Sequence, residues 1–368
     1  MSQSDGADGA ALNGGADWAA AALAPSIERG LEEEINPVPR LRLDRRPPRL
    51  VCIGGGTGLP MVLRGLVRRR GADLRYPEPQ ITAIVAMSDD GGSSGRLRRS
   101  RGSLPPGDVR KCLVALASGN NELSKIFRYR FGGSAGLAGH AVGNLLITAM
   151  AELKGDFLEA IKSSADLLGA HGTVLPCTLS PVELVAYKAG EACVAGERNL
   201  GRVPGRVVRI GLRPKSPPPV DAALEAIESA DLISIGPGSL YSSILPNLLV
   251  DGVARALRQT RALKILISNL MTQPGETDGM DCADHVRAVI DHAGPVVDVV
   301  LVNATPFDPE TVQRYARRGS EPVHFDRAAV LRTGVIPLET DLLKDGPRIR
   351  HDGRKLARRL TRIARCGP

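Results

Sequence analysis

A short apolar run that opens directly into a glycine cluster constrains the fold of this chain more than any other stretch. The run covers residues 50–53, and apolar side chains recur at helical spacing after the cluster, so the pattern predicts strand, turn and helix. Glycine lets a backbone approach a ligand closely, and a helix N-terminus offers unpaired N–H groups to an anion. A phosphate-binding loop is therefore predicted, with a tight strand-to-helix turn that holds no ligand as the alternative. The cluster consists of Gly54, Gly55, Gly56, Thr57 and Gly58.

Neither of the two familiar phosphate-loop patterns is complete in this cluster. The P-loop and the dinucleotide pattern G-x-G-x-x-G both require a glycine at the position of Leu59. The sequence therefore predicts a related loop and not either named motif.

Strand-like apolar runs alternate with amphipathic helical segments from residue 49 onward. Continuous Val, Ile and Leu runs suit a parallel sheet buried on both faces, and the alternation predicts right-handed connections. We therefore expect an α/β fold: a doubly wound, mostly parallel Rossmann-like sheet with helices on both faces, in one domain over 49–368. Residues 1–48, rich in Ala, Gly, Pro and Arg, are expected to be a disordered extension, apart from a short helix at 18–23. The expected strands are 50–53, 81–86, 207–210, 232–235, 265–267 and 297–302, and the expected helices are 59–69, 108–117, 122–131, 142–153, 157–168, 220–228, 248–259, 282–292, 309–317 and 353–364.

The charge, cysteine and apolar patterns exclude several classes of protein. The net charge is +8, but aromatic residues make up 3% and no nucleic-acid module is present, so we expect local anion sites and no nucleic-acid partner. The six cysteines are scattered without a C-x-x-C pair, which indicates reduced thiols in a cytoplasmic protein. No apolar run reaches the length of a membrane span, and residues 1–5 do not begin a secretory signal.

Two adjacent aspartates follow the second predicted strand. Asp89 and Asp90 could hold a divalent cation such as Mg²⁺ or accept hydrogen bonds from ribose hydroxyls, with an ordinary turn as the alternative. Asp108 is either a third metal ligand or the N-cap of the helix behind it. Residues 91–95 match G-x-S-x-G, but aspartates and glycines separate the serine from the strand, so we reject a hydrolase triad.

Polar residues also follow the fourth and fifth predicted strands. Gly236, Gly238 and Ser239 form a second strand–loop–helix junction, whose hydroxyls can donate to phosphate. Asn269 follows the next strand. Because the carboxyl ends of parallel strands meet at one edge of the sheet, the sequence predicts a single ligand crevice there.

A histidine and an asparagine form one further candidate pair. His140 and Asn144 are spaced i, i+4, so we expect them to share a helix face. Flanking glycines would let a ligand approach, and a structural, hydrogen-bonded histidine is the alternative.

These stretches together resemble the CofD-like superfamily, and in particular its YvcK branch of gluconeogenesis factors. The resemblance implies a cytoplasmic bacterial protein linked to gluconeogenic growth, cell shape and cell-wall synthesis. It also implies binding of UDP-sugars such as UDP-N-acetylglucosamine, with no assigned reaction. Cell-wall or metabolic proteins are the implied partners, and a homo-oligomer is compatible with the sequence. The stretches that carry the resemblance are 54–58, 89–96, 106–110, 143–146, 236–241, 244–249 and 268–277.

The CofD branch itself implies a second function. Its members are 2-phospho-L-lactate transferases that use a divalent metal, and Asp89, Asp90 and Asp108 match its metal-site positions. The helical deazaflavin-binding insertion of that branch is not recognisable here, which argues against transferase chemistry. An NAD-type dinucleotide-binding protein that uses the same crevice is the third alternative.

The resemblance also implies roles for individual residues in binding a nucleotide sugar. The two glycine loops would contact the diphosphate, Tyr315 would stack on the uracil, and Arg350 would hold the diphosphate. Core packing for the tyrosine and a surface charge for the arginine are the alternatives. No catalytic residue is assigned. The nucleotide- and phosphate-binding set is Gly55, Gly56, Thr57, Gly58, Ser93, Ser94, Asn144, Gly236, Gly238, Ser239, Asn269, Tyr315 and Arg350.

Overall fold

The computed structural model describes residues 46–67, 78–117, 121–134, 136–190 and 193–366, which belong to one compact unit. All but the last three residues of the predicted extension 1–48, including the expected helix at 18–23, lie outside the described residues.

Seven parallel strands form the central sheet, and the chain changes direction across it at β1 (Arg49–Gly54). Strand β2 (Gln80–Val85) pairs with β1 on one side, and β7 (Leu232–Ile235) pairs with it on the other. Connections that leave neighbouring strands toward opposite sides open a crevice beyond the carboxyl ends of those strands. The predicted α/β fold with a mostly parallel sheet is confirmed. The strand order is β10-β9-β8-β7-β1-β2-β3, with β3 at Thr173–Pro176, β8 at Leu263–Ile267, β9 at Val299–Asn303 and β10 at Ile336–Thr340.

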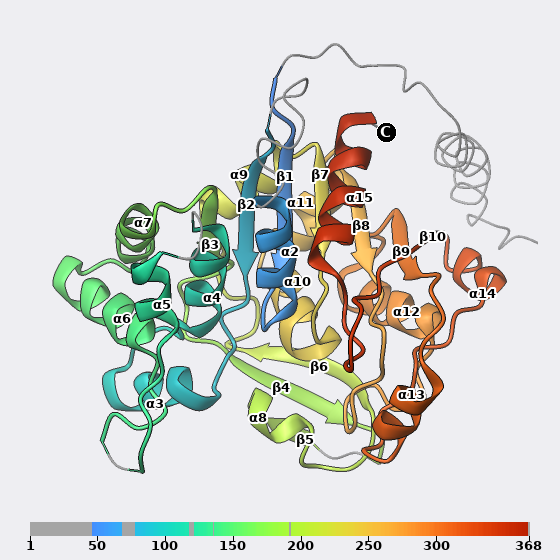
Figure 1. Cartoon of the computed structure of the whole chain (residues 1–368), viewed down its shortest axis with the longest axis horizontal. Helices are drawn as coiled ribbons and strands as arrows, with labels where there is room; N and C mark the ends of the chain where they lie inside the picture. The colour runs from blue at the N-terminus through green and yellow to red at the C-terminus, as the bar shows by residue number, and fades with distance from the viewer. Residues whose placement is uncertain (1–45, 68–77, 118–120, 135, 191–192, 367–368) are drawn as a thin grey trace, which may run out of the picture. The chain divides into compact units, whose positions relative to one another are not determined.

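Helices cover both faces of this sheet. In Figure 1, α2 (Gly58–Val67) and α15 (Gly353–Cys366) lie in front of the strands, while α9 (Asp221–Glu228) and α11 (Val253–Gln259) lie behind them. The strands between these layers are short apolar runs whose side chains are buried, as the sequence predicted for a parallel sheet. The other helices that match predicted segments are α4 (Gly107–Leu116), α5 (Glu122–Arg128), α6 (Val142–Lys154), α7 (Phe157–Leu168), α12 (Cys282–Ala293) and α13 (Pro309–Ala316).

Several short elements were not predicted. The expected helix 248–259 is interrupted, because Gly252 adopts a left-handed conformation (φ +75°) immediately before α11. Helix α3 (Gly92–Arg101) was not predicted, because Leu97 is its one aliphatic residue and the segment has no apolar periodicity that would indicate a helix. The other unpredicted helical segments are α8 (Glu197–Leu200), the π-helical turn η2 (Leu240–Ile244), α10 (Leu245–Leu248) and α14 (Arg327–Leu331). The strands at 173–176, 183–188, 193–195 and 336–340 were not predicted either.

A small antiparallel sheet lies beyond the carboxyl ends of the parallel strands (Figure 1). Its strand order is β5-β4-β6, with β4 at Glu183–Lys188, β5 at Cys193–Ala195 and β6 at Val207–Arg213. The sequence placed 207–210 in the parallel sheet, and that assignment is wrong. Strand β6 pairs antiparallel with β4, and Val208 is 58% exposed, so this strand is not buried on both faces.

Helices α2 and α15 cross at a point where two glycines are required. A Cβ at Gly65 would lie 1.9 Å from the carbonyl oxygen of Gly353, and a Cβ at Gly353 would lie 2.4 Å from that of Met61. Any side chain at either position would push the helices apart. The segment that enters α15 is thereby held beside the beginning of α2, next to the glycine loop.

Candidate functional site

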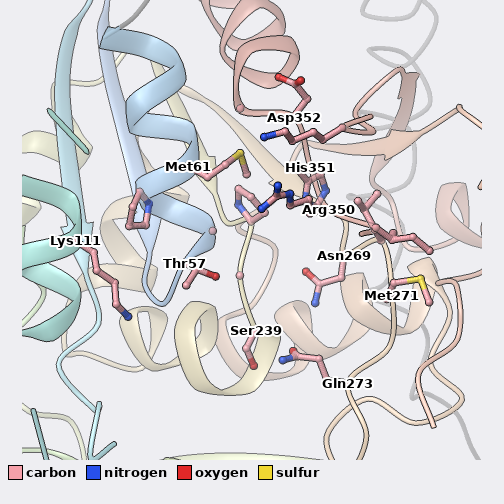
Figure 2. A pocket seen from close by; sticks show the side chains of 18 of the residues that line it. Thr57, Met61, Lys111, Ser239, Asn269, Met271, Gln273, Arg350, His351 and Asp352 are labelled. Carbon is pink, nitrogen blue, oxygen red and sulfur yellow. The ribbon is translucent and has the colours of Figure 1, made fainter. Parts of the chain in front are cut away.

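A cavity of about 1090 Å³ opens beyond the carboxyl ends of the parallel strands. Residues that follow four different strands line it: 57–65 after β1, 237–239 after β7, 269–274 after β8 and 344–354 after β10. Figure 2 shows Lys111 on one wall and Arg350 on the opposite wall, with Thr57 between them. This arrangement supports the predicted single crevice.

The two glycine loops press directly against each other at the floor of the cavity. A Cβ at Gly58 would lie 2.0 Å from the carbonyl oxygen of Pro237, so only glycine fits this junction. Ser239, which lines the cavity, donates to Glu276 Oε2 at 2.7 Å and accepts from the N–H of Ser242 at 3.4 Å. The two loops therefore form one packed unit and not two separate phosphate cradles.

A carboxylate of the protein already occupies the inner side of the first glycine loop. Asp108 Oδ2 accepts from the N–H of Gly56 at 2.5 Å, and Asp108 Oδ1 accepts from Lys111 Nζ at 2.7 Å. The N-cap alternative for Asp108 is wrong, because α4 begins at Gly107 and its N-cap is Pro106. The cavity face of the loop is presented by Thr57 and Gly58.

An acidic group lies behind the loop, on the side of the small antiparallel sheet. Asp89 Oδ1 accepts from the N–H of Gly91 at 2.8 Å, and Asp90 Oδ1 accepts from the N–H of Arg198 at 3.0 Å. Burial raises the pKa of Asp89, and the negative charge of Asp108 raises it further.

Glu197 joins this group, although the sequence gave no sign of it. Burial, together with the charges of Asp89, Asp108 and Asp90, raises the pKa of Glu197 to about 8, so its carboxyl stays largely protonated at neutral pH. In the described part of the chain, no three His, Cys, Asp or Glu side chains are arranged to hold a metal ion. A Mg²⁺ site at Asp89, Asp90 and Asp108 stays a prediction.

His140 and Asn144 do not share a helix face, so that expectation is wrong. Helix α6 begins at Val142, whose N–H bonds to the carbonyl of Tyr129, and His140 lies before it. His140 Nδ1 lies 3.1 Å from Ser93 Oγ. Asn144 is buried and accepts from Arg110 Nε at 2.7 Å, so it contacts the cavity through that arginine.

The opposite wall carries three of the predicted ligand residues and one that was missed. Asn269, Tyr315 and Arg350 line the cavity, as does His351. His351 is buried, and burial lowers its pKa to about 4, so the ring is neutral at physiological pH. Its Nε2 lies 3.1 Å from the carbonyl oxygen of Ser268, which can only accept, so Nε2 carries the proton.

The lining of the cavity is strongly basic. Eight of its side chains are cationic and one, Asp352, is acidic. Asp352 Oδ1 already accepts from the N–H groups of Arg354 and Lys355 at the start of α15. A cavity of this charge and size suits an anionic small molecule. The cations are Arg64, Arg110, Lys111, Arg128, Arg318, Lys344, Arg350 and Arg354.

The structure thus divides the predicted site residues into two groups. Arg110 and Lys111 were missed, although they follow Asp108 directly in a stretch that the sequence had singled out. The predicted residues that line the cavity are Thr57, Gly58, Gly238, Ser239, Asn269, Tyr315 and Arg350, whereas Gly55, Gly56, Ser93, Ser94, Asn144, Gly236, Asp89, Asp90 and Asp108 are not among its lining residues.

Comparison with known proteins decides the family. The family described as 2-phospho-L-lactate transferase CofD matches residues 50–343. The chain belongs to the CofD family. The match includes both glycine loops and α4, and it ends before the segment 344–354 that forms part of the cavity wall.

Relatives within the CofD family are similar over most of their length. A protein from Nostoc sp. is 45% identical over 337 residues, which cover 90% of this chain and 72% of the relative. The gluconeogenesis factor of Bacillus subtilis is 38% identical, with 84% of this chain and 96% of the relative covered. The crystal structure of a UPF0052 family member from Bacillus halodurans is 39% identical, with a TM-score of 0.80 over 86% of this chain and 99% of that one.

No helix in the described ranges is both long and apolar enough to cross a membrane.

Proposed function

We propose that this chain is a gluconeogenesis factor that binds a nucleotide sugar of the UDP-N-acetylglucosamine type and regulates partner proteins of cell-wall synthesis and cell shape. The observation that carries the proposal is the basic cavity at the carboxyl ends of the strands, with eight cationic side chains and one carboxylate. Relatives named gluconeogenesis factor, at about 40% identity, support the regulatory part.

The cavity contains a suitable contact for each part of such a ligand. Arg350 offers a guanidinium for the diphosphate, and Thr57 and Ser239 offer hydroxyls. Tyr315 offers an aromatic face to the base. The carboxamide of Asn269 points into the cavity in Figure 2 and can both donate and accept, as recognition of a base edge or an acetamido group requires.

Calorimetry with UDP-N-acetylglucosamine, GDP and NAD, each with and without magnesium, tests the proposal. Arg350→Ala should weaken binding of the UDP-sugar by about 1.5–3 kcal/mol, because a charge-assisted contact to phosphate is lost. Arg213→Ala is the matched control, since this exposed arginine pairs with Glu183 on the small sheet and does not line the cavity. Equal affinity of wild type and Arg350→Ala would remove Arg350 from the site, and no binding of any UDP-sugar would refute the proposal.

A metal-dependent transferase is the second candidate, and the buried acidic group favours it. Asp89, Asp108 and Glu197 interact electrostatically behind the glycine loop, where a divalent cation would lower the raised pKa values of Asp89 and Glu197. The family description names a phospholactate transferase. Magnesium-dependent turnover of a guanylated phospholactate would establish this function instead of the sensor.

A further inference from the structure

Arg110 is a buried cation whose side chain is held by two other helices of the fold. Its side chain is only 6% exposed, on α4. Nε donates to Asn144 Oδ1 on α6 at 2.7 Å, and Nη1 donates to the carbonyl oxygen of Phe127 on α5 at 3.2 Å. A Cβ at position 143 would lie 2.8 Å from Arg110 Cδ, so Gly143 leaves the space for this side chain. The guanidinium therefore has one defined orientation.

No carboxylate in the described part of the chain forms an ion pair with Arg110. Asp108 favours the charged form of the guanidinium, but its two oxygens accept from Lys111 and from Gly56. Burial, and then the charge of Arg130, lowers the pKa of Arg110 to about 10, so the group remains charged at neutral pH. A buried charge without a counter-ion is strongly unfavourable unless a ligand supplies one.

Arg110 lines the cavity and has one guanidinium nitrogen without a hydrogen-bond partner in the described part of the chain. Nε and Nη1 are held by protein oxygens, whereas Nη2 has no hydrogen-bond partner among the described residues, and Arg110 is one of the cavity-lining residues. Lys111 and Arg128 line the cavity beside it, from α4 and α5. We call these three residues the α4–α5 wall. Lys111 and Arg350 lie on opposite walls in Figure 2, so the α4–α5 wall is distinct from the Arg350 side.

The charge and size of the cavity exceed what one nucleotide sugar requires. The diphosphate of such a ligand carries two negative charges, against eight cationic side chains and one carboxylate in the lining. The volume of about 1090 Å³ lies just above the usual range of pockets for single small ligands, roughly 300–1,000 Å³.

We propose that the α4–α5 wall, centred on Arg110, is a second anion subsite that takes the phosphate group of another small molecule while the nucleotide sugar lies on the Arg350 side. Arg110 is the phosphate contact, and Asn144 is a positioning residue that aims it. The assignment of the opposite side to the sugar nucleotide rests on the proposed function. A second ligand in the same cavity would make occupancy of one subsite depend on the other.

Calorimetric titration with inorganic phosphate, alone and at saturating UDP-N-acetylglucosamine, tests the subsite in the full chain. We expect one phosphate to bind in addition to the sugar nucleotide. Arg110→Met should lower phosphate affinity at least tenfold more than it lowers UDP-sugar affinity, and Arg350→Ala should show the reverse preference. Asn144→Asp leaves Arg110 in place but supplies a counter-ion beside it, so phosphate affinity should again fall. Arg213→Met is the control for loss of a surface charge.

Three results would overturn the inference. Competition between phosphate and the UDP-sugar, with equal losses for both in Arg110→Met, would assign Arg110 to the diphosphate of the nucleotide. Phosphate binding that is unchanged in Arg110→Met and Asn144→Asp would show that the subsite lies elsewhere. A lowered melting temperature in Arg110→Met without any change in anion binding would give the arginine a purely structural role. If phosphate binds in an Arg110-dependent manner but no UDP-sugar binds, the subsite is supported and the proposed function fails.

Discussion

Replacing Glu197 by glutamine should remove a contribution to stability that falls as pH rises between about pH 5 and pH 8. Burial and the neighbouring carboxylates raise the pKa of Glu197 from 4.5 to about 8 in the folded protein. Above pH 4.5 the unfolded chain releases this proton, whereas the folded chain keeps it. The contribution of Glu197 to the free energy of unfolding therefore falls as pH rises through this window, by about 1.4 kcal/mol per pH unit and about 4–5 kcal/mol in total.

Glutamine resembles the protonated carboxyl in shape and cannot ionise, so the variant keeps the low-pH stability at higher pH. We expect wild type and Glu197→Gln to unfold at similar urea concentrations at pH 5, and the variant to be more stable by several kcal/mol above pH 8. The raised pKa of Asp89 adds a slope of the same sign, whereas the lowered pKa of His351, about 4, adds a slope of opposite sign below about pH 6.5. Both slopes are shared by wild type and variant, so the difference between the two curves isolates Glu197. Urea unfolding from pH 5 to pH 9 measures both curves.

Glu183→Gln is the matched control, because this carboxylate lies on strand β4 of the small sheet and pairs with Arg213 near the surface. Its curve should follow that of wild type. Two outcomes would refute the reasoning: a stability difference between Glu197→Gln and wild type that does not grow between pH 5 and pH 8, or a Glu197→Gln variant that is destabilised equally at every pH.

Two further substitutions test the packing that shapes the cavity. Gly58→Ala would place its Cβ 2.0 Å from the carbonyl oxygen of Pro237, so we expect a loss of about 1–3 kcal/mol in urea unfolding, whereas Gly211→Ala, with no atom within 4 Å of its Cβ, should cost little. Lys188 is buried and donates to the carbonyl oxygens of residues 200, 203 and 275. These hydrogen bonds connect the small sheet to the loop that contains residue 275, next to the cavity-lining residues 269–274. Lys188→Met should lower the unfolding free energy by about 2–4 kcal/mol, because three buried carbonyls lose their partner, and an unchanged midpoint would contradict this assignment.

The parts of the fold that the sequence predicted are those encoded by local patterns. The apolar run of β1 and its glycine cluster identified the centre of the sheet, and α7 was predicted with its observed bounds, where Asp156 caps its start and Gly169 its end. Strand β6 was placed in the wrong sheet, because a run of Val and Ile does not tell which strand it will pair with.

The predicted crevice coincides with a cavity of the structure, and its role in binding a ligand stays a prediction. Spacing along the chain identified the turns at the edge of the sheet, and Asn269 lines the cavity. Arg350 also lines it, but this residue was named from the family resemblance. Spacing could not show that Asp108 bonds to the first glycine loop from behind, or that Asn144 aims Arg110. Such roles depend on contacts between elements distant in sequence, which no local pattern records.

The crossing of α2 and α15 at Gly65 and Gly353 determines when during synthesis and folding the cavity is completed. One wall of the cavity follows β1, near the beginning of the domain, and another is held by α15, the last helix of the fold. The cavity is therefore complete only after α15 has been synthesised and has docked. A polypeptide that is still being synthesised, or that has lost α15 to proteolysis, would not bind the proposed ligand. Conversely, the proposed ligand, once bound, would stabilise α15 against local unfolding. Slower amide hydrogen exchange in α15 would then measure how much of the cavity is occupied.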